Sequence, residues 1–298
     1  MKTFLLRWFA GVVLLGAIAL NAHALTGMIY QPQLRDMKVP EAFWATKFSD
    51  LRQRGFDTLI IQWTRYGDAF STGVEKNWLT ARLQDAAKAD LKLVIGLYAD
   101  PDSFASLDMP TDLLETYFLK MHETHLQLAR DWLKTLPAQS IIGWYLPTEI
   151  DDRRWRDNSD LTVLNKQLAR DVTGLNSLGD LPVYITAFFK GHTEANEYKA
   201  MLSVIQRSTA LRIWVQDGVG TRSLLPTETS LYINKLTECS DTPIAGLVFE
   251  IFRQVGPDSN FKAEPLTGRT LEKALSQRSP CRGDSVFFSL RYLFNFGN

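Results

Sequence analysis

The sequence predicts an α/β fold, and within that class a single (β/α)₈ barrel, from three observations. Short apolar runs rich in β-branched residues alternate with longer segments of helical period along the chain. The alternation repeats eight times, and strands that are joined by crossover helices form a parallel sheet, which eight such units can close. No glycine-rich phosphate fingerprint follows the first strand, which argues against an open nucleotide-binding sheet.

The expected elements follow one another in a regular order. The strands are the apolar runs 27–31, 56–63, 91–98, 141–146, 181–187, 211–216, 243–250 and 285–291. The helices are the segments 40–54, 78–90, 111–136, 160–178, 194–209, 224–239 and 266–277. In the first helix Ala42, Phe43, Phe48 and Leu51 form an apolar stripe, and Gly55 ends the helix. Little chain follows the eighth strand, so the last helix is expected to be short or absent.

The first 24 residues have the features of a secretory signal peptide. Lys2 and Arg7 supply positive charge, 8–20 is almost wholly apolar, and small residues precede a cleavage point after Ala24. A membrane-spanning helix needs about 20 apolar residues, and this run is shorter. We therefore expect export to the periplasm or the medium, with no stable membrane insertion after cleavage. The mature chain, 25–298, has the length of one barrel domain.

Charge and motifs narrow the classes of function. Lys+Arg and Asp+Glu are both 33, so the neutral chain lacks the basic character of a nucleic-acid-binding protein. His122 and His125 have a spacing unlike that of zinc proteases and are expected on a solvated helix face. The sequence contains no metal-ligand pattern and no G-x-S-x-G motif, so no metal or other cofactor is expected.

The sequence contains two cysteines, Cys239 and Cys281. An even number in an exported protein favours a disulfide, although two unpaired thiols are the alternative. The loop between them is long, and the chain-entropy model gives about 4 kcal/mol for closing it.

Two stretches of similar design supply the candidate catalytic residues. Glu149 follows the apolar run that begins at Ile141, and Glu250 ends the run that begins at Pro243. A single loop carboxylate often only caps a helix, but active sites of barrels lie at the C-terminal ends of the strands. Alternation along the strands points both carboxyls into the barrel mouth. Glycoside hydrolysis requires such a pair, one protonated to donate to the leaving oxygen and one ionised.

Other side chains near the expected strand ends are candidates for binding a sugar. Aromatic faces stack on sugar rings, and buried amides need hydrogen-bond partners that hydroxyl groups can supply. The candidates are Gln31, Gln62, Trp63, Tyr98, Tyr145, Phe188, Gln216 and Asp217. Core packing explains the aromatic residues equally well, and an aspartate before glycine in a turn, as in Asp217-Gly218, needs no substrate.

The placement of Glu149 and Glu250 resembles that in clan A glycoside hydrolases. These are (β/α)₈ barrels whose acid/base follows the fourth strand and whose nucleophile follows the seventh. The resemblance implies that Glu149 is the acid/base and Glu250 the nucleophile. Many clan members have asparagine before the acid/base, whereas this chain has Thr148.

Most of the mature chain also resembles an uncharacterised bacterial family of barrels that are regarded as glycosidases. The matching stretches are LIIQW at 59–63, GWYLPTEID at 143–151 and VQDGVG at 215–220. We therefore expect an exported, retaining glycoside hydrolase acting on a polysaccharide or oligosaccharide. The alternative is a barrel that binds a glycan without cutting it, in exopolysaccharide assembly or processing. A deacetylase or lyase is less favoured, and the sugar, the linkage and the oligomeric state stay open.

Overall fold

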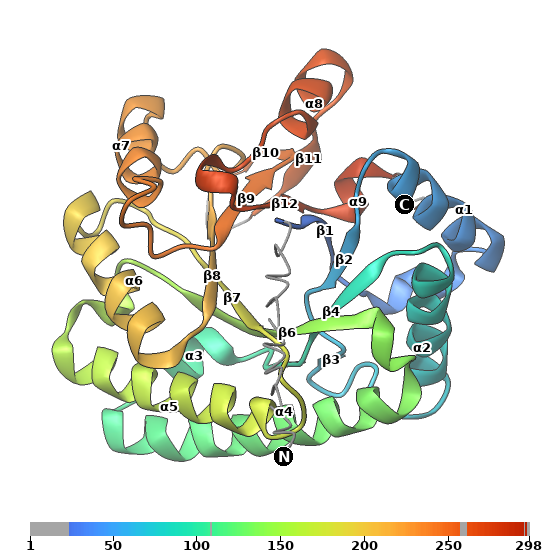
Figure 1. Ribbon diagram of the computed structural model, residues 1–298, viewed down its shortest axis with the longest axis horizontal. Helices are drawn as coiled ribbons and strands as arrows, with labels where there is room; N and C mark the ends of the chain where they lie inside the picture. The colour runs from blue at the N-terminus through green and yellow to red at the C-terminus, as the bar shows by residue number, and fades with distance from the viewer. Residues whose placement is uncertain (1–23, 108, 257–260, 295, 297–298) are drawn as a thin grey trace, which may run out of the picture.

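The computed structural model describes residues 24–107, 109–256, 261–294 and 296. These residues form a closed barrel of eight parallel strands with helices around it (Figure 1). The ring runs β1-β2-β4-β6-β7-β8-β9-β12 and closes where β12 pairs with β1. The predicted (β/α)₈ barrel is therefore confirmed. The predicted signal peptide lies outside the described residues except for Ala24.

The barrel strands occupy the predicted runs, with different ends. They are β1 (Thr26–Tyr30), β2 (Thr58–Ile61), β4 (Lys92–Gly96), β6 (Ile141–Ile150), β7 (Val183–Ala187), β8 (Arg212–Gln216), β9 (Gly246–Glu250) and β12 (Asp284–Phe288). The strand β6 extends four residues beyond its predicted end at Leu146, so Glu149 belongs to the strand. Two further pairs of short strands were not predicted. They are β3 (Arg65–Tyr66) with β5 (Tyr98–Ala99), and β10 (Phe252–Gln254) with β11 (Ala263–Pro265).

The helices cover the outside of the barrel (Figure 1). They are α1 (Glu41–Gln53), α2 (Gly73–Lys88), α3 (Ser103–Leu107), α4 (Thr111–Thr135), α5 (Asn158–Asn176), α6 (Ala195–Thr209), α7 (Pro226–Leu236), α8 (Gly268–Leu275) and α9 (Leu290–Leu293). Short 3₁₀ helices lie at Leu34–Lys38, Ala138–Ser140, Arg154–Arg156 and Pro280–Arg282. The helix α9 has four residues, as expected for a short last helix.

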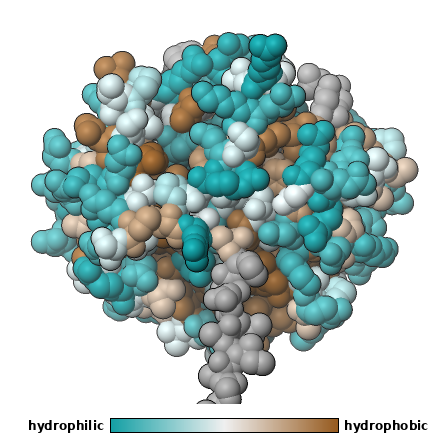
Figure 2. Space-filling model, turned by 45° about the horizontal axis from the view of Figure 1, so that its top comes forward, coloured by the Kyte–Doolittle hydropathy of each residue, from teal (hydrophilic) through white to brown (hydrophobic). Residues whose placement is uncertain are grey.

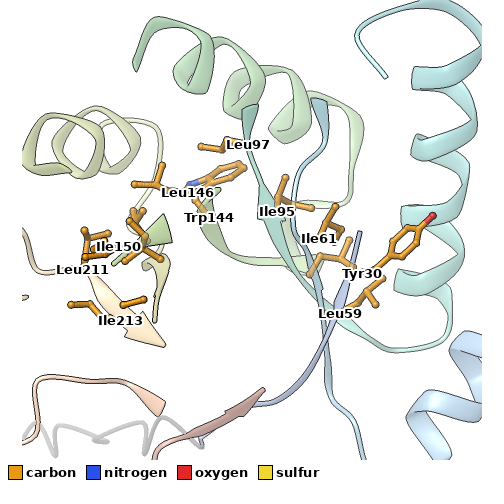
Figure 3. Packing of buried hydrophobic residues seen from close by; sticks show 14 of the residues in the cluster. Tyr30, Leu59, Ile61, Ile95, Leu97, Trp144, Leu146, Ile150, Leu211 and Ile213 are labelled. Atoms are coloured by element: carbon orange, nitrogen blue, oxygen red, sulfur yellow. The ribbon is translucent and has the colours of Figure 1, made fainter. Parts of the chain in front are cut away.

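Two hydrophobic layers hold the barrel together. The inner layer fills the barrel and is formed by Leu25, Ile29, Ile60, Val94, Tyr145, Tyr184, Trp214, Val248 and Val286. The outer layer lies between strands and helices, and Figure 3 shows Leu97, Trp144 and Leu146 packed together within it. Adjacent residues such as Trp144 and Tyr145 thus enter different layers, because side chains alternate along a strand. Full burial of each large apolar side chain contributes about 1.5–3 kcal/mol.

The two histidines of α4 correct one expectation. His122 and His125 are buried rather than solvated, and both contact Asp171 of α5. The Nδ1 atoms lie 2.8 Å (His122) and 3.5 Å (His125) from Asp171 Oδ1. Burial raises the pKa of Asp171, but the hydrogen bond with His122 and the nearby His125 outweigh it and lower the pKa to about 2. The histidines were misplaced because α4 packs along α5 and buries polar positions between the two helices.

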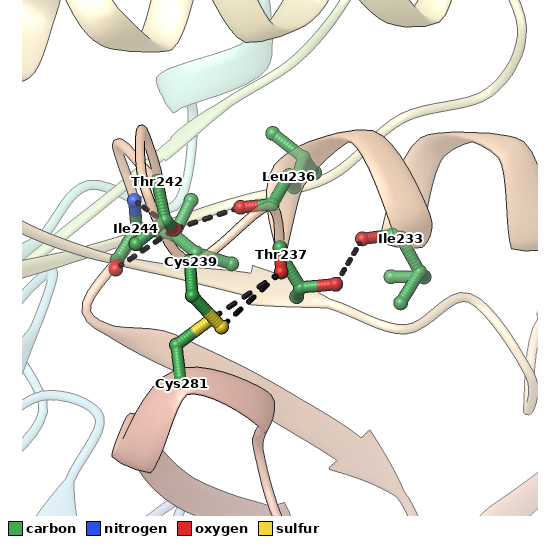
Figure 4. The surroundings of a disulfide bond; sticks show 7 residues. All are labelled: Ile233, Leu236, Thr237, Cys239, Thr242, Ile244 and Cys281. Atoms are coloured by element: carbon green, nitrogen blue, oxygen red, sulfur yellow. Dashed lines mark hydrogen bonds between the residues drawn. A yellow bond between two sulfur atoms is a disulfide. The ribbon is translucent and has the colours of Figure 1, made fainter.

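Cys239 and Cys281 form a disulfide, as predicted (Figure 4). It links the segment after α7 to the 3₁₀ helix before β12, near the N-terminal ends of the strands. Their separation of 42 residues in sequence corresponds to about 4 kcal/mol in the chain-entropy model.

The surface is mainly polar on the face shown in Figure 2, where hydrophobic residues lie in small groups between hydrophilic ones. Single exposed apolar residues such as Val74 and Leu225 are ordinary on a protein surface. Within the described residues, no helix combines the length and the hydrophobicity needed to cross a bilayer.

Candidate active site

A cavity of about 290 Å³ lies at the C-terminal ends of the strands. It is lined by Ile29, Gln31, Gln62, Glu149, Thr186, Gln216, Thr221, Val248, Glu250, Phe252, Phe261, Phe288 and Tyr292. Several of these residues follow an inner-layer residue by two positions, as Gln216 follows Trp214 and Glu250 follows Val248. The period of two along each strand therefore brings side chains that are far apart in sequence to one layer above the apolar core.

A bulge in β6 sets the position of Glu149. Leu146 pairs with Ile185 of β7, but the next pair is Glu149 with Thr186, so Pro147 and Thr148 are extra residues. Proline has no N–H to donate to a neighbouring strand, and bulges are common beside active sites. Because two residues are inserted, Glu149 still faces the barrel interior, as simple alternation from Tyr145 predicts.

Glu149 is held by an amide side chain. Gln216 Nε2 donates a hydrogen bond to Glu149 Oε1 at 2.8 Å. Burial of the carboxyl raises the pKa of Glu149, the hydrogen bond from Gln216 opposes this, and the charge of Asp151 raises the pKa further. The net shift is upward, so the protonated form of Glu149 is favoured relative to a solvated glutamate.

Glu250 is held by the backbone of the loop after β8. Its Oε2 atom accepts hydrogen bonds from the N–H groups of Gly220 (2.7 Å) and Thr221 (3.1 Å). Gly220 is needed for this approach, since a Cβ there would lie 2.9 Å from Glu250 Oε2. Burial and the charge of Asp217 raise the pKa of Glu250, and Glu149 adds to this effect. The two N–H groups act in the opposite direction by stabilising the carboxylate.

Asp217 lies behind Glu250 and does not line the cavity. Its Oδ1 atom accepts hydrogen bonds from the backbone N–H groups of Val219 (3.1 Å) and Glu250 (3.3 Å). Burial raises the pKa of Asp217, which is 6% exposed. The bond from Val219 is the turn expected for an aspartate before glycine, and the bond from Glu250 shows that Asp217 also contacts the strand that carries this glutamate.

The other predicted binding residues divide into two groups. Gln31, Gln62 and Gln216 line the cavity, whereas Trp63, Tyr98, Tyr145 and Phe188 do not. Three of these four residues lie beyond the ends of their barrel strands, and the fourth, Tyr145, belongs to the inner layer of the barrel.

Trp63 follows the inward-facing Gln62, and its indole N–H donates to the carbonyl of Pro32 at 3.1 Å. Tyr98 lies beyond β4 in the short strand β5, with the Arg65 guanidinium 5.2 Å from its ring centroid.

The remaining two aromatic residues also lie away from the cavity. Tyr145 is fully buried, and its hydroxyl lies 2.7 Å from the hydroxyl of the cavity residue Thr186. Phe188 lies just after the end of β7, and its carbonyl accepts a hydrogen bond from Tyr198 at 3.0 Å. Tyr145 thus supports the site from beneath.

An aromatic wall on one side of the cavity was missed from the sequence. It consists of Phe252, Phe261, Phe288 and Tyr292, and the ring centroids of Phe252 and Tyr292 lie 5.1 Å apart. Phe288 is the last residue of β12, but the predicted eighth strand ran on to Arg291, so the strand-end rule did not point to Phe288. Phe252 and Phe261 reach the cavity through the β10–β11 hairpin, which strand alternation does not predict.

The described part of the chain shows no group of three or more histidine, cysteine, aspartate or glutamate side chains arranged to hold a metal ion. The potential ligands at the mouth are Glu149, Asp217 and Glu250, and Asp217 faces the backbone of the loop.

Comparison with known proteins identifies the family. The model of the domain of unknown function DUF4434 matches residues 25–293, so the chain belongs to this family. The chain is 37% identical over 273 residues to the uncharacterized protein YbcH of Escherichia coli (strain K12), and the match covers 91% of each chain.

Solved structures with the same fold include glycoside hydrolases. One is a candidate α-L-fucosidase from Bacteroides thetaiotaomicron VPI-5482, with a TM-score of 0.64, 14% identity, and coverage of 95% of this chain and 91% of that one. Another is the catalytic domain of a β-amylase from Paenibacillus polymyxa, with a TM-score of 0.56, 10% identity, and coverage of 91% and 94%. At these identities the likeness concerns the fold alone.

Proposed function

We propose that this protein is an exported glycoside hydrolase that cleaves a polysaccharide or oligosaccharide with Glu149 and Glu250. The observation that carries the proposal is that both carboxyls line one cavity at the barrel mouth. Both have a raised pKa, caused first of all by burial. The glycosidase-like fold and the disulfide, which persists in oxidising compartments, support an extracytoplasmic enzyme. The periplasm or the medium is the proposed location.

In the proposed reaction Glu149 donates its proton to the glycosidic oxygen while Glu250 attacks the anomeric carbon. The N–H groups of Gly220 and Thr221 hold the charge of Glu250 before the attack. Asp217 and Glu250 share one buried environment and titrate together, so the attack requires the form of the pair in which Glu250 is ionised and Asp217 carries the proton. Water then releases the sugar, giving one proton back to Glu149, and the anomeric configuration is retained.

The test is the cleavage of a panel of aryl glycosides and oligosaccharides by the exported protein and by Glu149→Gln and Glu250→Gln. Each substitution is expected to lower kcat/KM by about 10²–10⁴-fold, because it removes a group that transfers a proton or attacks carbon. The matched control is Glu264→Gln, which changes an exposed carboxylate on β11 that pairs with Arg253. Proton NMR of the first product shows which anomer forms and thus tests retention.

Unchanged cleavage in both cavity variants would reject the assigned roles. A protein that binds glycans but releases no product over long incubation would be the non-catalytic glycan-binding barrel, and the hydrolase proposal would then fail.

A further inference from the structure

We infer that the cavity binds a single uncharged sugar residue at the end of a glycan chain and discriminates against uronic acids and other anionic sugars. The inference rests on the proposed function only in taking a sugar as the ligand. It follows from three features of the cavity: its charges, an unpartnered amide oxygen and its size.

The cavity has only one sign of charge among its described lining residues. Glu149 and Glu250 carry carboxyl groups, and no lysine, arginine or histidine lines the cavity with them. Asp217 adds a third carboxyl directly behind Glu250. The carboxylate of a uronic acid would need a cation or several donors to replace its water. In this cavity it would instead face groups of its own charge.

Two arginines of the neighbouring elements already have acidic partners, while Arg222 and Lys262 adjoin lining residues but do not themselves line the cavity. Arg291 of α9 binds Asp36, with Nη2 at 2.7 and 2.9 Å from the two carboxylate oxygens. Arg253 of β10 pairs with Glu264 at 2.8 Å. Moving either guanidinium to a sugar carboxylate would break an existing ion pair, so the two arginines do not offset the negative charge of the cavity.

Gln62 lines the cavity, and its amide oxygen has no partner within the described protein. Gln62 Oε1 is buried and accepts no hydrogen bond. A buried polar atom without a partner costs about 1–3 kcal/mol. The amide of Gln216 donates to Glu149, and among the described residues Gln62 Oε1 receives no hydrogen bond from it or from any other donor. A sugar hydroxyl group would donate to Gln62 Oε1, so this acceptor favours a sugar as the ligand, while the charges of the cavity decide against an anionic one.

The size and the aromatic wall fit one sugar ring. The volume of about 290 Å³ is at the lower limit of the about 300–1,000 Å³ that is usual for small-ligand pockets. Phe252, Phe288 and Tyr292 offer aromatic surface for the apolar C–H face of the ring. A cavity of this size suits the terminal residue of a chain better than several consecutive residues.

The first experiment measures binding to the wild-type protein by isothermal titration calorimetry. The probes are methyl glycosides of neutral hexoses, in both anomeric forms, and the uronic acids of the same configuration. At about pH 9, the neutral member of the pair that binds best is expected to bind about tenfold or more tightly than its uronate. At about pH 5 the difference should shrink, because the raised pKa values of the glutamates let them take up protons while the uronate stays ionised.

The second experiment tests the amide. Gln62→Met keeps the length of the side chain but removes its polar atoms, and it is expected to weaken binding of the neutral glycoside about tenfold. The matched control is Gln127→Met on α4, whose amide donates to the exposed side of Asp131, and it should bind like the wild type. Thermal unfolding of both variants verifies that they are folded.

The outcomes separate this inference from the proposed function. A uronate that binds as tightly as its neutral partner, or no binding by any member of the panel, overturns the inference, even if the protein cleaves glycans. Unchanged affinity in Gln62→Met overturns the role of the amide. Selective binding of neutral sugars without any cleavage supports the inference and rejects the hydrolase.

Discussion

The carboxylates at the two ends of the barrel differ in their partners, because the one at the N-terminal end has a cation beside it and the two at the mouth do not. At the N-terminal end, Asp284 is 2% exposed, and its oxygens accept hydrogen bonds from Leu25 N, Arg212 and Trp214 Nε1 at 3.0–3.2 Å. At the mouth, Glu149 and Glu250 have amide partners, but within the described residues neither has an ion pair.

The difference indicates which end is built for stability and which for chemistry. A buried carboxylate with a cation and two N–H donors is fully compensated, and such a group fixes the positions of β1, β8 and β12 relative to one another. A buried carboxyl without a cation has a raised pKa, which destabilises its ionised form and suits proton transfer. Barrels generally place their active sites at the mouth and leave the other end to stability.

The largest loss of stability is expected from Asp284→Ala at the N-terminal end of the barrel. The substitution leaves the N–H groups of Leu25 and Trp214 without their acceptor and removes the partner of Arg212. The free energy of unfolding should fall by about 3–5 kcal/mol. Urea denaturation measures this fall, while kcat/KM of the folded protein should stay the same. If Asp284→Ala lowered the free energy of unfolding by less than about 0.5 kcal/mol, as an ordinary surface substitution does, the N-terminal end would not be the stabilising end of the barrel.

The second largest loss of stability is expected from removing the disulfide, which lies at the same end of the barrel. Replacing both Cys239 and Cys281 by serine should lower the free energy of unfolding by about 2–4 kcal/mol, because the unfolded chain gains freedom. Denaturation of the wild type with and without a reducing agent is the matched measurement. If the double variant lost glycan binding without losing stability, the N-terminal end would not be purely structural.

The smallest expected effect is a gain in stability, and it comes from replacing Glu250 at the mouth of the barrel. The folded protein holds the pKa of Glu250 above its unfolded value, so the folded state binds the proton more tightly than the unfolded state. Stability should therefore fall as pH rises from about 5 to about 8. Glu250→Gln should reduce this decline, leaving the share of Glu149 and Asp217, and should gain on the order of 2 kcal/mol near pH 8.

The control is the same pH series on Glu264→Gln, which should keep the decline of the wild type. A Glu250→Gln protein that is less stable than the wild type at every pH would show that the mouth, too, relies on its carboxylate for stability.

Much of this molecule follows from local pattern alone. Eight apolar runs separated by helical periods predicted the barrel, and the two-residue period of a strand placed Glu149 and Glu250 on the inside. This worked for Glu149 although β6 contains a bulge, because the two inserted residues leave the alternation unchanged. The cysteine pairing was also predicted, since only one pair is possible.

Other features depend on contacts between segments that are distant in sequence. The β10–β11 hairpin brings Phe252 and Phe261 to the cavity, and the packing of α4 on α5 buries His122 and His125. The pKa shifts arise from burial and from through-space charges.

The sequence by itself determined the architecture and the faces of the strands, because these follow from periods of a few residues. Only the tertiary structure decided that Asp217 contacts the backbone of Glu250 and that Trp63 and Tyr98 lie away from the cavity. It also decided that the amide oxygen of Gln62 has no partner among the described residues. The physical reason is that these properties depend on where each strand ends and on which loop folds over it.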